Sequence, residues 1–335
     1  MGGHSGLSDK DNLVGLAAFS KPGNFYKGNI HLHSTHSDGS LTPAEVVEAY
    51  RSRGYDFVSI TDHFLNRAYL MGLIGRKDHV DDGAFITVND TSALRTPDFT
   101  TLFGSEIHGP GMANGANWHM VAVGLPLDFA PWDGQESGAA ITERAANAGA
   151  FIGIAHPAAS TVTMEDVKQV LPFAHSVEIY NHACNLFGMT DSWHFADILI
   201  QDGNRLSAYA ADDAHAVGAR PGVSDAFGGW VHVKAASLDP DALLEALKAG
   251  EFYSSTGAQL HNVAIEGDEL VVASSPATAI LVTGKGGYKY KLAGGGEPLE
   301  AARFPLTPIQ EMGYCRVTVI GPNGERAWSN PIWFE

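Results

Sequence analysis

The sequence predicts an α/β barrel followed by a small antiparallel β domain, and three observations carry this prediction. Short apolar runs alternate with helical segments up to about residue 257. Side chains that bind metals stand at or just past the ends of these runs, which is where the loops of a barrel build a site. From residue 258 the chain changes to short alternating segments between Gly- and Pro-rich turns. We therefore expect an N-terminal extension over residues 1–27, a barrel over 28–257 and a β domain over 258–335.

Helices and strands are expected to alternate along residues 42–249. Thr42-Pro43-Ala44-Glu45 combines a side-chain cap, a proline at the first helical position and a capping-box glutamate, so a helix is expected from there to about Arg53. Residues 55–60 are expected to form a buried strand. The same unit recurs as helix 139–148 before strand 151–155, helix 164–171 before strand 176–180, helix 191–200 before strand 206–211, and an amphipathic helix over 243–249.

The last part of the chain favours strands alone. Residues 262–266, 279–283 and 315–320 alternate between apolar and polar side chains. Glycine-rich turns at 286–287 and 294–296 separate such segments. These segments predict a small antiparallel sheet.

Composition limits the function classes. The chain has 38 acidic and 21 basic side chains and a formal charge of −17, which disfavours binding to duplex nucleic acid. Cys184 and Cys315 lie far apart, so neither a disulfide framework nor a thiolate zinc motif is expected. No segment is long and apolar enough for a membrane span, and the first 20 residues lack a signal pattern. We expect a cytoplasmic protein, unless a signal peptide was removed upstream of this sequence.

Histidines and carboxylates follow the apolar runs in a regular order. Alternate residues of an extended segment point to one side, so His31 and His33 are able to bind one ion together. A carboxylate such as Glu106 is able to bridge two ions, and water shared by two cations becomes acidic enough to act as hydroxide. The sequence therefore predicts a multinuclear metallohydrolase with candidate ligands His31, His33, Asp38, His63, Glu106, His119, His156, Asp213 and His215.

Five ordered motifs resemble those of the PHP superfamily, named for polymerase and histidinol phosphatase. The resemblance covers roughly residues 28–257. The motifs are His31-Leu-His33-Ser34-Thr35-His36-Ser37-Asp38-Gly39, Thr61-Asp62-His63, Gly104-Ser105-Glu106, Ala155-His156-Pro157 and Asp213-Ala214-His215.

The resemblance implies a distorted seven-stranded (β/α) barrel and two or three divalent ions. Asp38 stands where some histidinol phosphatases of the superfamily have histidine. Zinc, manganese and iron all accept imidazole and carboxylate, so the metal stays open. The implied sets are His31, His33, Glu106 and Asp213 for one ion, Glu106, His119 and His156 for a second, and Asp38, His63 and His215 for a third.

Three functions follow from the resemblance. The first is hydrolysis of a small, anionic phosphomonoester or phosphodiester through a metal-bridging hydroxide. The second is hydrolysis of a carboxyl or carbamate ester or an amide, because Ser329-Asn330-Pro331-Ile332-Trp333-Phe334 is similar to the tail of a PHP subfamily that includes carbaryl hydrolases. The third is a metal-stabilised interaction module, like the PHP domains linked to polymerases. The oligomeric state stays open.

Further side chains are expected to contact substrate or orient the ligands. His36, His182 and Arg220 are the leading catalytic candidates, because they lie in loops after strands and are able to donate to an oxygen of the substrate. His108 and Arg67 are further candidates of this kind, placed in loops. Glu178, Asp62 and Asp212 are expected either to orient ligands or to make ordinary structural hydrogen bonds.

Overall fold

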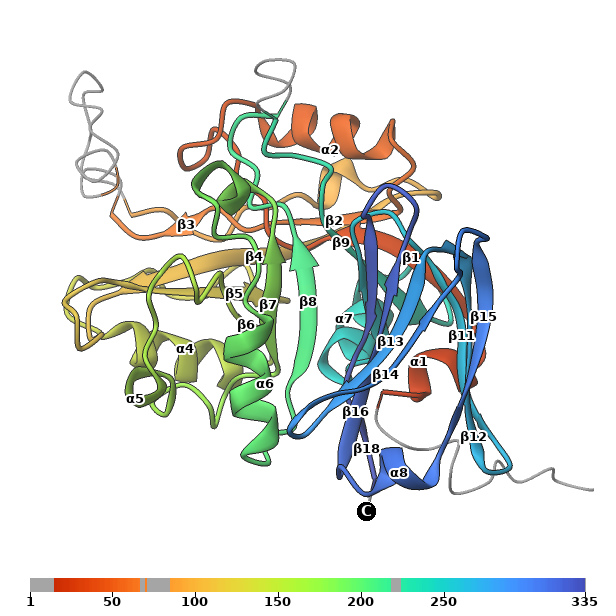
Figure 1. The fold of residues 1–335 in the computed structure, drawn as a ribbon. Helices are drawn as coiled ribbons and strands as arrows, with labels where there is room; N and C mark the ends of the chain where they lie inside the picture. Colours follow the sequence, from red (N-terminus) through yellow and green to blue (C-terminus); the bar gives the residue numbers. More distant parts are fainter. Residues whose placement is uncertain (1–14, 67–69, 71–84, 218–223, 335) are drawn as a thin grey trace, which may run out of the picture.

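The computed structural model describes residues 15–66, 70, 85–217 and 224–334. Within them lie a 15-stranded mixed sheet and a separate three-stranded antiparallel sheet (Figure 1). Helices pack on the large sheet. The predicted α/β class is therefore confirmed.

The N-terminal strands carry the candidate ligands. Neighbours run parallel except at β5, which is antiparallel to both β4 and β6. Past the two outermost strands, Leu32 and Ala214 form an isolated parallel bridge, so the segments that follow β1 and β8 meet. The strands are β1 (Asn24–Asn29), β2 (Phe57–Ile60), β3 (His63–Phe64), β4 (Thr100–Gly109), β5 (Trp118–Val123), β6 (Phe151–Ile154), β7 (Ser176–Asn181) and β8 (Ser207–Ala211).

Four of the described helices begin at a side-chain cap, provided by Thr42, Ser137, Thr163 and Asp239. Thr42 and Glu45 form a capping box at the start of α2. The helix after Thr163 is shorter than expected, because the chain passes into turns ahead of Pro172. In the described part of the chain, no helix has the length and apolar character of a membrane span. The helices are α1 (Ala17–Ser20), α2 (Pro43–Arg51), η2 (Ser92–Leu94), α4 (Gly138–Asn147), α5 (Met164–Val167), η3 (Ala183–Phe187), α6 (Trp193–Gln201), α7 (Pro240–Lys248) and α8 (Thr307–Gln310).

The C-terminal strands continue the large sheet. β9 (Trp230–Ala235) pairs with β1 and with β10 (Phe252–Ser255), and β10 pairs with β17 (Arg326–Ser329). The sheet goes on through β16 (Tyr314–Ile320), β13 (Ala279–Gly284) and β14 (Gly287–Ala293), with β18 (Ile332–Trp333) beside β16. The separate sheet contains β11 (Leu260–Glu266), β12 (Glu269–Ala277) and β15 (Leu299–Pro305). The expected domain boundary at residue 258 falls between β10 and β11, and it stays a prediction.

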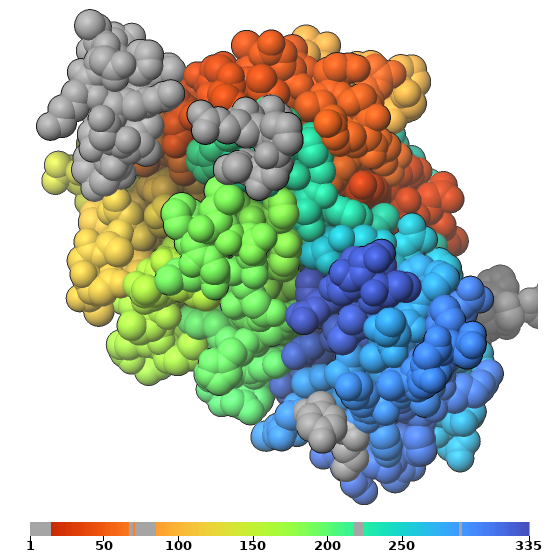
Figure 2. Space-filling model, turned by 45° about the horizontal axis from the view of Figure 1, so that its top comes forward, coloured from red at the N-terminus to blue at the C-terminus, as the bar shows by residue number. Residues whose placement is uncertain are grey.

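The open side of β8 is covered by side chains of later segments. Ala208 N donates to Asn330 Oδ1 at 2.8 Å, and Ala210 N donates to Ser254 Oγ at 3.0 Å. Asn330 Nδ2 in turn donates to the carbonyls of Gly250 and Phe252 at 2.9 and 3.0 Å. Figure 2 shows the blue C-terminal residues lying against the green segment that includes β7 and β8. Backbone groups that lack a strand partner are thereby satisfied.

Aromatic side chains fill the space beside the N-terminal strands. A Cβ at Gly28 would lie 2.1 Å from the Phe57 ring, and one at Gly153 would lie 2.6 Å from the Tyr209 ring. Phe57 and Tyr209 are fully buried and belong to one core cluster. The glycines thus leave room for two large rings, and this packing fixes the strands whose ends carry the candidate ligands.

Candidate metal centre

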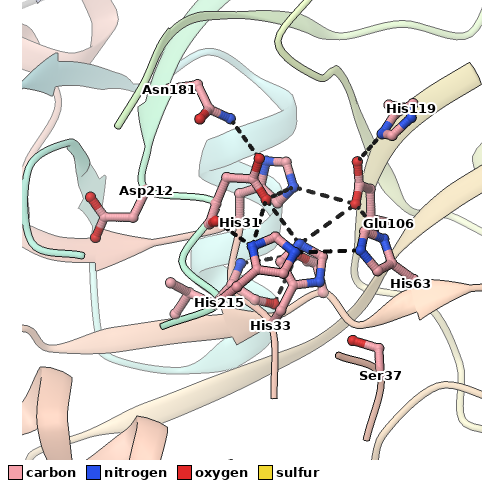
Figure 3. Close-up of polar contacts among 12 residues, drawn as sticks. His31, His33, Ser37, His63, Glu106, His119, Asn181, Asp212 and His215 are labelled. Atoms are coloured by element: carbon pink, nitrogen blue, oxygen red, sulfur yellow. Dashed lines mark hydrogen bonds and ion pairs between the residues drawn. The ribbon is translucent and has the colours of Figure 1, made fainter. Parts of the chain in front are cut away.

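The nine candidate ligands converge, as Figure 3 shows for six of them. His63, Glu106 and His119 lie within β3, β4 and β5, and the other six follow β1, β6 and β8. Their ligand atoms fall into groups in which every atom lies within 4.8 Å of the others. These groups are His31, His33, Glu106 and Asp213; Glu106, His119 and His156; and His33, Asp38, His63 and His215. The structure therefore brings together each set that the resemblance implies, and adds His33 to the third.

Glu106 stands between the groups. Its Oε1 lies 2.8 Å from His119 Nδ1 and 3.3 Å from His156 Nε2. Its Oε2 lies 2.7 Å from His63 Nδ1 and 3.5 Å from His33 Nε2. Glu106 is fully buried, and its Oε2 has no hydrogen-bond partner among the described residues. The two oxygens thus face different sets of imidazoles.

Asp213 joins the first pair of histidines. Its Oδ1 lies 3.2 Å from His31 Nε2 and 3.0 Å from His33 Nε2. Asp213 has a φ of 57°, and His156 has a φ of 26°, a region that non-glycine residues rarely adopt. Such backbone strain persists where the surroundings hold it in place, and it is frequent at functional sites.

The third group is built around Asp38. Its Oδ1 lies 3.3 Å from His63 Nε2 and 3.5 Å from His215 Nε2. The other ring nitrogen of His215 donates to the Asp213 carbonyl at 2.8 Å, which turns Nε2 toward the group. His63 therefore faces Asp38 with one nitrogen and Glu106 with the other.

Glu178 orients two of the histidines. Its Oε1 accepts from His31 Nδ1 at 2.9 Å, and its Oε2 accepts from the backbone N–H of His156 at 2.7 Å. Asn181 donates both to Glu178 Oε2 at 3.0 Å and to Asp213 Oδ2 at 3.1 Å. Both side chains are buried. This hydrogen bond fits both roles considered for Glu178, so orientation of a ligand stays a prediction.

Two orienting residues were not predicted from the sequence. One is Asn181, which follows Glu178 by three residues on β7. The other is Ser160, whose Oγ lies 2.8 Å from His156 Nδ1. Asn181 follows the expected strand 176–180 and precedes His182, which is the one signal that the sequence offers for it. Ser160 carries no such signal.

Asp62 and Asp212 hold the backbone beside the ligands. Asp62 accepts from Ser34 N–H at 2.8 Å and from Ser37 Oγ at 2.7 Å, and thereby fixes the turn that carries Asp38. Asp212 points away from the cluster in Figure 3. It accepts from Tyr50 Oη at 2.7 Å and from the backbone N–H groups of residues 227, 228 and 229.

The expected catalytic residues lie apart from the clustered ligand atoms. His36 Nε2 donates to the Thr87 carbonyl at 3.1 Å. His182 Nδ1 lies 3.2 Å from Tyr180 Oη. Neither side chain belongs to the groups formed by the described residues. Arg220 and Arg67 lie outside the described residues.

His108 was expected in a loop, and that expectation is wrong. It lies within β4, because β5 pairs along the whole end of that strand, with His108 opposite His119. Its side chain is buried, with Nε2 3.1 Å from Glu106 Oε2 and 2.6 Å from His63 Nδ1. His108 therefore belongs to the cluster.

The electrostatics of the cluster follow from burial and mutual charge. Burial opposes ionisation of Glu106, but His108, His63 and His119 hold its pKa well below the ordinary value. Burial, together with His215 and His63, lowers the pKa of His33 to about 4. Burial would also lower the pKa of His63, but Glu106 and Asp38 raise it to about 10. Ionised carboxylates thus alternate with imidazoles.

This donor set fits divalent metal ions. His31 Nε2, His33 Nδ1 and Glu106 Oε2 are buried atoms without a hydrogen-bond partner among the described residues. Such atoms are costly unless something binds them. Imidazole nitrogen combined with carboxylate oxygen suits zinc, manganese and iron.

Comparisons with known proteins bear on the fold. No protein-family model matches the chain. A two-domain protein from Bacteroides vulgatus ATCC 8482 that contains a predicted PHP-like metal-dependent phosphoesterase superposes with a TM-score of 0.51 at 15% identity, over 94% of this chain and 98% of that one. An amidohydrolase from Chromobacterium violaceum covers 57% of this chain and 88% of its own at 16% identity, with a TM-score of 0.39, too low to bear on the fold.

One curated sequence matches locally. The DNA polymerase/3'-5' exonuclease PolX of Bacillus subtilis (strain 168) is 49% identical over 37 residues. This match spans 11% of the present chain and 6% of that protein's length. The similarity of the tail to carbaryl hydrolases stays a prediction. From its superposition along nearly the whole chain, the protein shares the fold of the two-domain protein from Bacteroides vulgatus.

Proposed function

We propose that this protein is a metal-dependent hydrolase that cleaves a small phosphomonoester or phosphodiester. The observation that carries the proposal is the position of Glu106, whose Oε1 faces His119 and His156 while Oε2 faces His63 and His33. A carboxylate between two sets of imidazoles is able to bridge two ions, as a binuclear hydrolase site would need its ions held close together. The shared fold with a protein that contains a predicted PHP-like metal-dependent phosphoesterase supports the same conclusion.

The chain's own residues would hold the ions and keep their ligands aligned. Divalent ions bound there would acidify a water molecule and offset the charge that builds on the substrate. Glu178 would hold His31 Nε2 toward its ion, since Nδ1 is already bonded to the carboxylate. The proposed sets are His31, His33, Glu106 and Asp213; Glu106, His119 and His156; and Asp38, His63 and His215.

Three residues are proposed to handle the substrate. His36 lies on the same turn as Asp38, and its ring is partly exposed. Protonated at Nε2 or Nδ1, it would donate to the leaving oxygen. His182 would serve the same purpose from the segment after β7, and Arg220 would pair with an anionic group of the substrate.

A second function is favoured by one observation. Among the described residues, none of the hydrogen bonds and ion pairs of the nine ligand side chains involves a lysine or arginine. A phosphomonoester dianion is commonly bound by such groups, whereas a carboxyl or carbamate ester or an amide presents a neutral carbonyl. The same cluster would then attack carbon in place of phosphorus.

The test is a comparison of initial rates on matched nitrophenyl substrates. Protein loaded with manganese, zinc or iron is assayed on the phosphate, the bis-phosphate, the acetate and a carbamate, each beside metal-free protein. Metal-dependent preference for the phosphoesters supports the main proposal, and preference for the acetate or carbamate supports the second. Full metal occupancy without turnover of any substrate above free metal would contradict both and favour an interaction module.

A further inference from the structure

His108 is a tenth candidate ligand that the five motifs do not supply. It follows Glu106 by two residues on β4, so both side chains point to the same face of the strand. The register of β4 with β5 places His108 opposite His119, and their ring centroids lie 4.1 Å apart. Its exposed fraction is 4%. The fold thus carries this ring into the interior of the cluster.

Three ligand atoms meet at one point. His108 Nε2 lies 3.1 Å from Glu106 Oε2 and 2.6 Å from His63 Nδ1, and this nitrogen of His63 lies 2.7 Å from Glu106 Oε2. Glu106 Oε2 has no hydrogen-bond partner among the described residues, although it is buried. A single proton shared between His63 Nδ1 and His108 Nε2 would leave Glu106 Oε2 without a hydrogen-bond donor. One metal cation, in contrast, is able to bind all three atoms.

We infer that His108 binds a metal ion through Nε2, in one set with His63 Nδ1 and Glu106 Oε2; the inference rests on the proposed function. Each oxygen of Glu106 then serves a pair of imidazoles, with His119 and His156 at Oε1 and with His63 and His108 at Oε2. His63 faces Asp38 with its second nitrogen. A neutral imidazole binds a metal through one nitrogen, so an ion held by His63 Nδ1 takes this ring from the third group, which keeps His33, Asp38 and His215.

The geometry sets one condition on this site. Two nitrogens bound tetrahedrally to zinc at about 2.0 Å lie roughly 3.3 Å apart. The rings of His63 and His108, whose nitrogens are 2.6 Å apart, must therefore separate on binding. The strand pairing fixes the backbone of His108, so side-chain rotation supplies this movement.

The experiment compares His108→Ala with His108→Gln in the full chain. Glutamine reaches about as far as the Nε2 of histidine and preserves a hydrogen bond, but it is a poor ligand for zinc and cobalt. Metal-free protein is titrated with zinc and cobalt(II) against a chelator, and zinc X-ray absorption counts the imidazoles per ion. Circular dichroism establishes that each variant is folded. Exposed His261→Gln, on β11, is the matched control.

If His108 is a ligand, both substitutions lower the affinity of one position by more than about 100-fold, beyond the range of an orienting residue, and reduce the imidazole count. If His108→Gln keeps its metal affinity while His108→Ala loses it, His108 acts as a hydrogen-bond partner and not as a ligand. That result would overturn the inference. Unchanged binding in both variants would do the same. His156→Gln distinguishes failure of the His108 inference from failure of the proposed function. Unchanged metal uptake in His156→Gln as well would contradict the proposed function itself.

Discussion

His31 Nδ1 donates to Glu178 Oε1 at 2.9 Å, between two side chains with no exposed surface. The second oxygen of Glu178 accepts from His156 N–H and from Asn181. A glutamine has one acceptor oxygen, so it cannot serve both sides. Glu178→Gln is expected to lower metal affinity by about 10–100-fold, the usual cost of losing an orienting partner. Chelator competition measures this loss.

The control for Glu178→Gln is Glu165→Gln, which removes an exposed carboxylate that pairs with Lys168. Both variants remove one formal negative charge. Equal metal affinity in the two would show that Glu178 acts through its charge alone, and the orienting role would be withdrawn.

The bridging role proposed for Glu106 gives a prediction about turnover. Glu106→Gln keeps the shape of the side chain but leaves one nitrogen in place of a ligand oxygen. We expect turnover to fall by roughly 1,000-fold, equivalent to several kcal/mol of lost transition-state stabilisation, with fewer ions bound per chain. His156→Ala is expected to lose turnover similarly, since it removes a ligand on the Oε1 side. Rates close to those of the unchanged protein would mean that the active site lies elsewhere.

Asn330 gives a prediction about stability. Its side chain accepts from Ala208 N–H and donates to the carbonyls of Gly250 and Phe252. Asn330→Ala leaves these buried groups without their partner and is expected to lower the free energy of unfolding by about 2–4 kcal/mol. Urea denaturation measures the change in the free energy of unfolding. The control is Asn323→Ala at an exposed position, whose free energy of unfolding is expected to stay within about 0.5 kcal/mol of that of the unchanged protein. A loss as small as the control's would show that water replaces the side chain.

His232 gives a prediction about pH. Trp230 Nε1 donates to His232 Nε2 at 2.9 Å, so the ring accepts and is neutral in the folded chain. Burial, and then Lys27, lowers its pKa to about 3. The unfolded chain binds this proton below about pH 6.5, so folding stability contributed by His232 is complete above that value and declines as pH falls toward 3.

Urea denaturation of metal-free protein tests this between about pH 4.5 and pH 7.5. His232→Gln, which cannot titrate, is expected to show a shallower fall in the free energy of unfolding with decreasing pH. The remaining slope includes His175, whose pKa burial and Lys248 lower to about 4. Identical slopes in the two proteins would contradict the assignment.

Features that depend on neighbouring residues in the sequence, such as helix caps and the order of candidate ligands, were predicted from the sequence. The helix after Thr42 begins at its capping box, and the order of histidines and carboxylates led to groups that the fold brings together. Their role as ligands stays a prediction. His108 was predicted as a substrate contact in a loop and Ser160 was not predicted at all, because their contacts depend on strand register and on a turn after His156.

The C-terminal part shows the same limit. Its strands were predicted one by one, but their continuation of the large sheet depends on the pairing of β10 with β17. In the sequence, β10 and β17 are separated by β11, β12 and β15 of the small sheet and by β13, β14 and β16 of the large sheet. Period-two alternation establishes a strand and one of its faces, and it contains no information on which distant partner forms the hydrogen bonds.

The pairing of β10 with β17 also determines where the gene can be shortened. A product that stopped near residue 257 would keep every candidate ligand, but it would present the backbone of Phe252–Ser255 as a bare edge. It would also lack Asn330, the cap on β8. Exposed strand edges of one molecule form backbone hydrogen bonds with those of another, which leads to aggregation. Residues up to about 257, expressed alone, would therefore aggregate although they keep every candidate ligand.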